Sequence, residues 1–139
     1  MFNIGFTTGV FDLFHIGHLN ILRKAKENCN YLIVGINTDE LVQKYKNKTP
    51  IIPYSERRAI IEAIRYVDKV IPQENQDYIE AYSRLKFDVM FIGDDWKGSP
   101  LYLNIEKNFK VLGVEVMYFP YTKGTSSTML TNVLNKLIT

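Results

Sequence analysis

Short apolar runs alternate with longer amphipathic stretches along the whole chain. The apolar runs predict strands at residues 2–8, 31–36, 66–71, 88–92 and 114–119. The stretches between them carry apolar side chains at helical spacing and predict helices at 18–27, from Ser55 onward, and at 77–86, 101–112 and 127–138. Strands that alternate with helices in this way predict a parallel sheet with helices on both faces, joined by right-handed crossovers.

Local signals indicate where several of these elements begin and end. Ser55 is expected to cap its helix, Pro72 to end the third strand, and Gly113 to end the fourth helix. The core-facing side chains of the helix at Ser55 are expected to be Ala59, Ile60, Ala63 and Ile64. No linker, repeat or low-complexity segment interrupts the pattern, so residues 1–139 are expected to form one α/β domain, a doubly wound sheet of five parallel strands.

Composition agrees with a self-contained folded domain. The 139 residues are 46% hydrophobic and 23% charged, which are ordinary values for a globular protein and exclude disorder as the main state. The net charge of +2 provides no general attraction for a nucleic-acid backbone. We therefore expect no nucleic-acid partner, and any anion site must be local.

Cellular location is addressed by three further features. The single cysteine, Cys29, excludes an internal disulfide, and the apolar runs are too short to span a bilayer. The first basic residue is Arg23, unlike the basic leader of a signal peptide. These features predict a cytoplasmic protein with no membrane partner.

Polar segments that contain glycine follow three of the predicted strands. They are residues 9–18, 93–98 and 121–128. The carboxyl ends of parallel strands meet at one edge of a sheet, and ligands bind there, at the point where the strand order reverses. The three segments are therefore expected to share a site.

The two histidines of the chain, His15 and His18, lie three positions apart in the first of these segments. If a helix begins near Ile16, both rings surround its first turn, where free N–H groups and the helix dipole favour an anion such as phosphate. Gly17 allows close approach of a ligand to the backbone. A cap at His15 and a surface position for His18 are the alternative, but the pairing after a strand favours a site.

Hydroxyl and cationic side chains occur in the other candidate segments. Residues 124–128 (GTSST) open the last helix, where hydroxyl and N–H groups suit phosphate oxygens, although such residues also serve as simple caps. The lysines within residues 44–50 could form a flexible basic loop that closes over a polyphosphate, or a solvated charge run. Asp94 and Asp95 could hold a divalent cation or ligand hydroxyls, and Asp12 lies next to the histidine pair, although carboxylates after strands also simply form turns.

Taken in order, these segments resemble the HxGH nucleotidyltransferase superfamily. The motif is HIGH at residues 15–18, after GVFD at 9–12, and Arg58 in YSERR resembles the arginine of that family's helix. RYVDKV at 65–70 and GDDW at 93–96 are similar to segments of the small bacterial glycerol-3-phosphate cytidylyltransferases, and GTSST to the second half of their RTEGISTT signature. The resemblance extends over essentially the whole chain.

The resemblance implies a Rossmann-like fold, usually dimeric, that makes a CDP-alcohol from CTP and a small phosphorylated alcohol, most simply glycerol 3-phosphate. It implies Mg²⁺ as the cofactor, with Asp12 and Asp94 as candidate ligands. The implied catalytic residues are His15, His18, Lys46 and Arg58. The implied nucleotide-binding residues are Gly9, Val10, Phe11, Asp12, Gly17, Lys48, Asp94, Thr122, Lys123, Gly124, Thr125, Ser126, Ser127 and Thr128. The implied acceptor-binding residues are Lys46, Arg65, Asp68 and Trp96.

The chain departs from the family pattern in two places. Tyr121 stands where the signature has arginine, and Lys123 could supply the lost charge. Residues 74–78 lack the lysines that the relatives carry in an acceptor-binding region. Tyr78, Tyr82 and Trp96 could instead bind a cationic head group such as choline, or could be ordinary packing aromatics.

Three other functions use related sequences. An adenylyltransferase with the same fold and a nucleotide-binding protein without activity both remain open at this level, although the intact histidine pair favours an enzyme. Class I aminoacyl-tRNA synthetases also contain HIGH, but this chain is too short for their catalytic and tRNA-binding parts and has no KMSKS segment.

Overall fold

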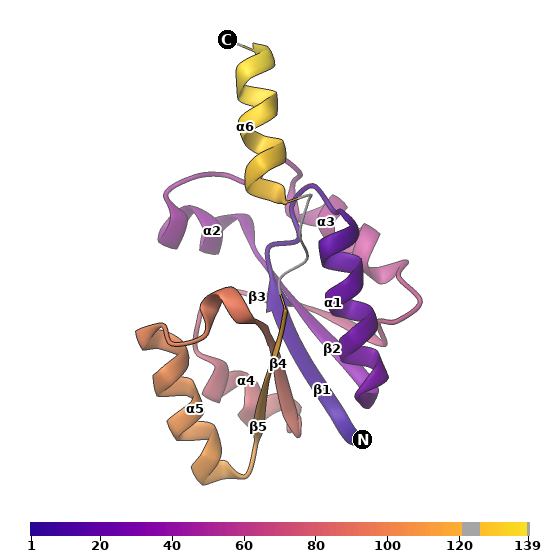
Figure 1. The fold of residues 1–139 in the computed structure, drawn as a ribbon, viewed down its shortest axis with the longest axis vertical. Helices are drawn as coiled ribbons and strands as arrows, with labels where there is room; N and C mark the ends of the chain where they lie inside the picture. Colours follow the sequence, from indigo (N-terminus) through magenta and orange to yellow (C-terminus); the bar gives the residue numbers. More distant parts are fainter. Residues whose placement is uncertain (121–125, 139) are drawn as a thin grey trace.

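Five parallel strands form one sheet in the computed structural model, which describes residues 1–120 and 126–138 (Figure 1). The strands are β1 (Phe2–Gly9), β2 (Cys29–Asn37), β3 (Lys69–Gln73), β4 (Val89–Gly93) and β5 (Glu115–Phe119). Their order across the sheet is β3-β2-β1-β4-β5, so the chain winds outward from β1 in one direction and then in the other. The predicted doubly wound, Rossmann-like α/β fold is confirmed, and the order reverses between β1 and β4.

Helices cover both faces of this sheet (Figure 1). They are α1 (Ile16–Glu27), α2 (Asp39–Lys46), α3 (Tyr54–Glu62), α4 (Tyr78–Leu85), α5 (Pro100–Leu112) and α6 (Ser127–Ile138), with a 3-10 turn η1 (Asp94–Trp96) after β4. One core layer joins α4 and α5 to the sheet through residues such as Phe6, Met90 and Phe109. The other joins α1 and α3 to it through Leu22 and Ile61. Strands covered on both faces explain the almost uninterrupted apolar runs of the sequence.

Two expectations about local structure were wrong. Pro72 does not end the third strand but pairs with Ile36 inside β3, which lies at the edge of the sheet, where proline is tolerated. Helix α3 begins at Tyr54 after the N-cap Pro53, so Ser55 lies within the helix and is not its cap.

The buried face of α3 also differs from the predicted one. Ala59, Ile60 and Ala63 are exposed, whereas Arg57 and Ile61 are buried. Helix α3 therefore turns the side of Arg57 and Ile61 toward the sheet, where the Arg57 side chain finds the polar partners described below. Helix α2 was not predicted, because its eight residues are too few to show a helical period.

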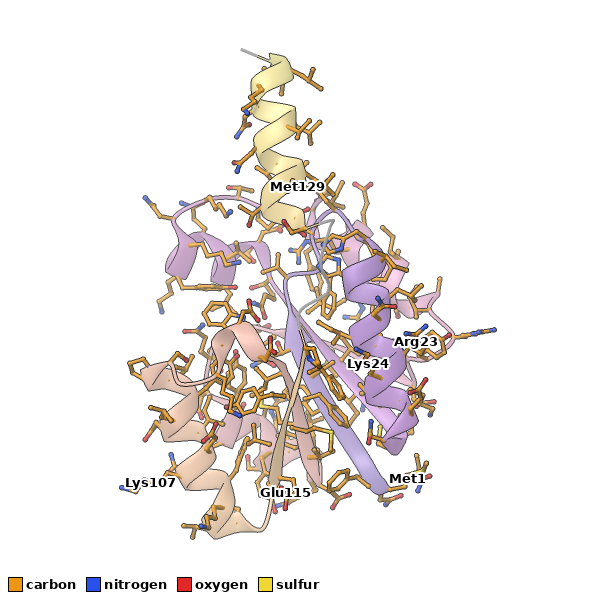
Figure 2. The ribbon with its side chains drawn as sticks, viewed as in Figure 1. Met1, Arg23, Lys24, Lys107, Glu115 and Met129 are labelled. Atoms are coloured by element: carbon orange, nitrogen blue, oxygen red, sulfur yellow. The ribbon has the colours of Figure 1, made fainter. Side chains whose placement is uncertain are left out.

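Helix α6 extends away from the sheet, beyond the carboxyl ends of the strands (Figure 1). Figure 2 shows Met129 near the start of this helix, while Met1 and Glu115 lie at the far end of the molecule. Of the helices in residues 1–120 and 126–138, none is both long and apolar enough to cross a membrane.

Candidate functional site

A cavity of about 450 Å³ opens at the carboxyl ends of the central strands. The ends of β1, β2 and β4 contribute to it, together with the loop between β1 and α1, helix α2 with the residues after it, the segment after β4, and the starts of α4, α5 and α6. Its charged and polar lining includes Asp12, His15, His18, Asn37, Lys46, Lys48, Asp95, Ser126, Ser127 and Thr128. The structure thus brings both imidazoles and the start of the last helix to one cavity, as predicted.

Both imidazoles are held by hydrogen bonds at the first turn of α1. His15 is the N-cap residue, and its Nδ1 accepts a hydrogen bond from the backbone N–H of Gly17 at 3.0 Å. The Nδ1 of His18 accepts in turn from the backbone N–H of His15 at 3.3 Å. Because each Nδ1 acts as an acceptor, the proton of each neutral ring is assigned to Nε2. Each ring therefore has an N–H donor for a phosphate oxygen.

Burial disfavours the protonated form of both rings. Desolvation lowers the pKa of His15. Desolvation, with a smaller contribution from His15, lowers the pKa of His18 to about 3. The rings stack on one another with their centroids 3.9 Å apart. A bound polyphosphate would favour the protonated form and would raise both pKa values.

Asp12 joins three parts of the site. Its carboxylate accepts hydrogen bonds from the backbone N–H groups of Ile51 at 2.8 Å and Ile52 at 2.9 Å. Its backbone carbonyl accepts from the hydroxyl of Ser127 at 2.5 Å. Asp12 therefore connects the loop between β1 and α1 with the segment that leads into α3 and with the start of α6.

The buried Arg57 also binds the backbone of the loops around the cavity. Its side chain is 1% exposed and donates to the carbonyl oxygens of Val10 (2.7 Å), Asn37 (2.8 Å) and Ile52 (2.9 Å). It also forms a salt bridge of 2.7 Å with the carboxylate of Asp39. Sequence reasoning missed this residue, because the two adjacent arginines of α3 look alike in the sequence and only the structure shows that Arg57 is the buried one.

The neighbouring Arg58 lies outside the cavity. Its guanidinium contacts the hydroxyl of Tyr54 at 3.1 Å, the carbonyl oxygen of Val70 at 3.3 Å and the carboxylate of Glu62 at 3.5 Å. The structure therefore does not bring Arg58 to the histidines, and Arg58 does not line the cavity in which the resemblance implied a catalytic role for it. In α3, Arg57 is the arginine that reaches the loops of the site.

Arg65 and Asp68 lie at the amino ends of the strands, opposite the cavity. The carboxylate of Asp68 accepts from the backbone N–H of Leu32, near the start of β2, and forms a salt bridge of 2.6 Å with Lys26. The exposed Arg65 lies over the ring of Tyr66. Within this chain the two residues are not part of the cavity, because the segment between α3 and β3 crosses the amino ends of the strands.

Some of the lysine and aspartate side chains expected at the site line the cavity, and others do not. Lys46 and Lys48 line the cavity, and desolvation lowers the pKa of Lys46. After β4, Asp95 and Trp96 line it, whereas Asp94 does not.

The short backbone segment before the histidines also forms part of the wall. The lining residues here are Gly9, Val10, Phe11 and Gly17. Of the residues expected in the last loop, Ser126, Ser127 and Thr128 line the cavity. Thr122, Lys123, Gly124 and Thr125 lie outside the described residues, as does Tyr121.

Aromatic residues form the wall of the cavity on the side of α4 and α5. Tyr78 is 3% exposed and Tyr102 is 8% exposed, and burial raises the pKa of both phenols. The hydroxyl of Tyr45 accepts a hydrogen bond of 2.8 Å from the side chain of Asn37. Of these tyrosines, sequence reasoning singled out Tyr78 alone, because the others lie on separate elements with no shared motif.

Metal binding finds limited support in the protein itself. Among residues 1–120 and 126–138, no group of three or more His, Cys, Asp or Glu side chains could hold a metal ion. Both carboxylate oxygens of Asp12 already accept backbone hydrogen bonds. The described residues therefore provide no preformed protein cage for a metal ion.

Comparison with known proteins is consistent with this geometry. The family model described as cytidylyltransferase-like matches residues 6–133. Glycerol-3-phosphate cytidylyltransferase of Bacillus subtilis is 40% identical over 129 residues, covering 89% of this chain and 91% of the relative. The enzyme of the same name from Staphylococcus aureus is 38% identical and covers 89% of each. FAD synthase of Pyrococcus abyssi is 40% identical over 114 residues, covering 81% of this chain and 77% of the relative.

Solved structures show the same architecture. A lipopolysaccharide core biosynthesis protein from Thermoplasma volcanium aligns with a TM-score of 0.72 at 26% identity, covering 90% of this chain and all of that one. Pantoate-beta-alanine ligase from Francisella tularensis, at 16% identity and a TM-score of 0.67, shares the fold. The match of the family model over residues 6–133, together with relatives about 40% identical over most of the sequence, shows that the chain belongs to the cytidylyltransferase-like family.

Proposed function

We propose that this protein is a nucleotidyltransferase that transfers a cytidylyl group from CTP to glycerol 3-phosphate. The observation that carries this proposal is the arrangement of both imidazoles and the start of α6 around one cavity. The relatives named glycerol-3-phosphate cytidylyltransferase, which match almost the whole chain, support the choice of nucleotide and acceptor.

The proposed reaction is a direct displacement. An oxygen of the acceptor phosphate attacks the α-phosphorus of CTP, the bond from that phosphorus to the bridging β-phosphate oxygen breaks, and pyrophosphate leaves. The second pKa of a phosphate monoester is about 6, so the nucleophile is already ionised at neutral pH and needs no general base. The protein must bring two polyanions together in line and stabilise the charge that develops between them.

The residues of the cavity match these tasks. The Nε2–H groups of His15 and His18 would donate to the phosphate oxygens around the reacting phosphorus. The hydroxyls and the backbone N–H groups at the start of α6 would hold the outer phosphates. Lys46 and Lys48 would neutralise the triphosphate and the acceptor phosphate.

Mg²⁺ is part of the proposal as an ion that arrives on the phosphates of CTP, a form of binding that needs few protein ligands. When bound, it would neutralise phosphate charge. We also propose that the protein works in the cytoplasm as a homodimer, as the family resemblance implies. Helix α6 exposes Val133, Leu134 and Leu137, which is apolar surface that a partner could cover. Analytical ultracentrifugation would show a species of twice the 16.2 kDa chain mass.

A panel of nucleotides and acceptors tests the proposed function. Pyrophosphate release would be measured with CTP or ATP against glycerol 3-phosphate, choline phosphate and FMN. Turnover with CTP and glycerol 3-phosphate alone is the expected result. A preference for ATP and FMN would support adenylyl transfer, which the resemblance to FAD synthase makes the second candidate.

The variant His18→Ala tests the role of the imidazole within that assay. Loss of one donor to a developing charge lowers kcat by about 10²–10³, so a fall of at least about a hundredfold is expected in a folded protein. Near-normal turnover of His18→Ala would contradict the proposed mechanism.

A further inference from the structure

Three rings surround the imidazole of His18. The ring of Phe11 packs edge-on with centroids 5.4 Å apart and an interplanar angle of 62°. The ring of Phe14 lies 5.4 Å away at 33°, and His15 stacks at 3.9 Å. Neither phenylalanine offers a polar group, so both exclude water from the imidazole without competing for its nitrogens.

The backbone adopts an unfavourable conformation to place these rings. Phe11 has a φ of +55° and Leu13 a φ of +50°, the left-handed region that side chains rarely occupy. A Cβ added at Gly9 would lie 3.1 Å from the ring of Phe11, so the absence of a side chain there makes room for this ring. Strained backbone that persists beside a site is a typical sign of a functional constraint.

The two phenylalanines differ in their relation to the cavity. Phe11 lines it and is 7% exposed. Phe14 does not line the cavity, and it packs against the buried cluster on the α1 side of the sheet. An effect of Phe14 on catalysis must therefore act through His18.

We propose that Phe11 and Phe14 are positioning residues that clamp the His18 imidazole between their rings, with its Nε2–H directed at the reacting phosphate. This inference rests on the proposed function for the identity of that phosphate. The hydrogen bond from the His15 N–H to Nδ1 of His18 sets which nitrogen carries the proton, and the aromatic clamp sets the plane of the ring. A donor held in one orientation does not have to reorganise as charge develops in the transition state.

The rings of Phe11 and Phe14 also favour the neutral form of the His18 imidazole. Desolvation is the main cause that lowers the pKa of His18, and the aromatic rings are its close neighbours. The other titratable groups of the cavity are His15 at the N-cap of α1, Lys46 and Lys48 on and after α2, Asp12 before α1, Asp95 after β4, and the phenols of Tyr45, Tyr78 and Tyr102. The three basic groups oppose protonation of the ring, whereas the carboxylates of Asp12 and Asp95 favour it.

The test compares Phe14→Leu with Phe119→Leu as a matched control. Phe119 belongs to the same buried cluster, stacks on Phe91 at 5.4 Å and does not line the cavity. Both substitutions remove a ring from that cluster, but only Phe14 contacts His18. Phe14→Tyr keeps the ring and is the conservative variant.

Two measurements are made on each variant. The sequence contains only two histidines, so the titration of each imidazole can be followed by NMR and assigned with His15→Gln. In Phe14→Leu the pKa of His18 is expected to rise by at least about one unit toward 6.5. The kcat is expected to fall about ten- to a hundredfold with little change in KM for CTP, because a misplaced group affects the transition state and not uniform binding.

Phe119→Leu and Phe14→Tyr are expected to keep the wild-type titration and kcat. An unchanged titration of His18 in Phe14→Leu, or equal effects of Phe14→Leu and Phe119→Leu, would overturn the proposal. If Phe14→Leu does not fold, Phe14→Met serves in its place with the same expected shift. The NMR titration needs no substrate, so a wild-type protein inactive on the panel would refute the proposed function and leave the clamp to be judged by its titration.

Discussion

The two adjacent arginines of α3 provide a sharp test of how the site is held together. Arg57 is buried and bound to three carbonyl oxygens and one carboxylate, all at 2.7–2.9 Å. Arg58, one position on, is 35% exposed at its side chain, and its contacts are longer, at 3.1–3.5 Å. The perturbation is Arg57→Met, with Arg58→Met as the matched control in the same helix.

The two expected losses differ by several kcal/mol. Removing one partner of a buried, hydrogen-bonded ion pair commonly costs about 3–5 kcal/mol, because the remaining groups stay buried without compensation. Here Asp39 would lose its cation, and Val10, Asn37 and Ile52 would lose a donor. A part-exposed pair such as Arg58 with Glu62 contributes below about 1 kcal/mol.

Urea denaturation and thermal unfolding, both followed by circular dichroism, measure the two losses as a free energy and as a shift in Tm. For a domain of this size, Arg57→Met is expected to lower the midpoint of thermal unfolding by about 10–20 °C, and Arg58→Met by only a few degrees. Arg57 also fixes the loop before the histidines, so a folded Arg57→Lys protein is expected to show a raised KM for CTP. Equal destabilisation by the two methionine variants, or a loss below about 1 kcal/mol for Arg57→Met, would refute this reasoning.

Two further predictions concern the loop that contains the histidines. The lowered pKa of His18 means that the unfolded chain takes up a proton below about pH 6.5 while the folded protein does not, so the contribution of this imidazole to stability should fall by up to about 1.4 kcal/mol per pH unit as the pH drops below 6.5. His18→Gln should flatten that dependence in urea titrations, and an unchanged slope would show that the imidazole already titrates normally. Asp12→Asn leaves one acceptor oxygen for the N–H groups of Ile51 and Ile52, so it should cost about 1–2 kcal/mol in unfolding free energy and raise KM for CTP. Wild-type stability and kinetics in Asp12→Asn would contradict the anchoring role.

Local signals were sufficient for most of the fold. The predicted strand at 31–36 lies within β2, and the predicted helix at 127–138 coincides with α6. Gly113 ends α5 in the left-handed conformation expected of a helix C-cap glycine. These elements were predictable because their apolar periodicity and their caps lie within a few residues of one another.

Elements that depend on tertiary contacts were not predictable in this way. Helix α2 is short, and its N-cap Thr38 differs little from a turn residue in the sequence alone. Pro72 pairs with Ile36 in β3 because that strand has a free edge, which depends on strand order.

The candidate site shows the same division. His15, His18 and Ser127 could be predicted because each lies in a polar segment that follows a strand, and the carboxyl ends of parallel strands meet at one edge of the sheet. Arg57 could not, because the choice between two adjacent arginines depends on the rotation of α3 against the sheet. The wall formed by Tyr102 depends likewise on how α5 packs.

The proposed mechanism requires that both imidazoles and the start of α6 bind one triphosphate. This can be tested by NMR of the protein labelled with ¹⁵N and titrated with CTP, because only two histidines contribute imidazole signals. The Nε2 signals of His15 and His18 and the amide signals of Ser127 and Thr128 are expected to shift together and to saturate at the same CTP concentration. Saturable binding of CTP, seen by calorimetry, that leaves the imidazole signals in place would contradict it.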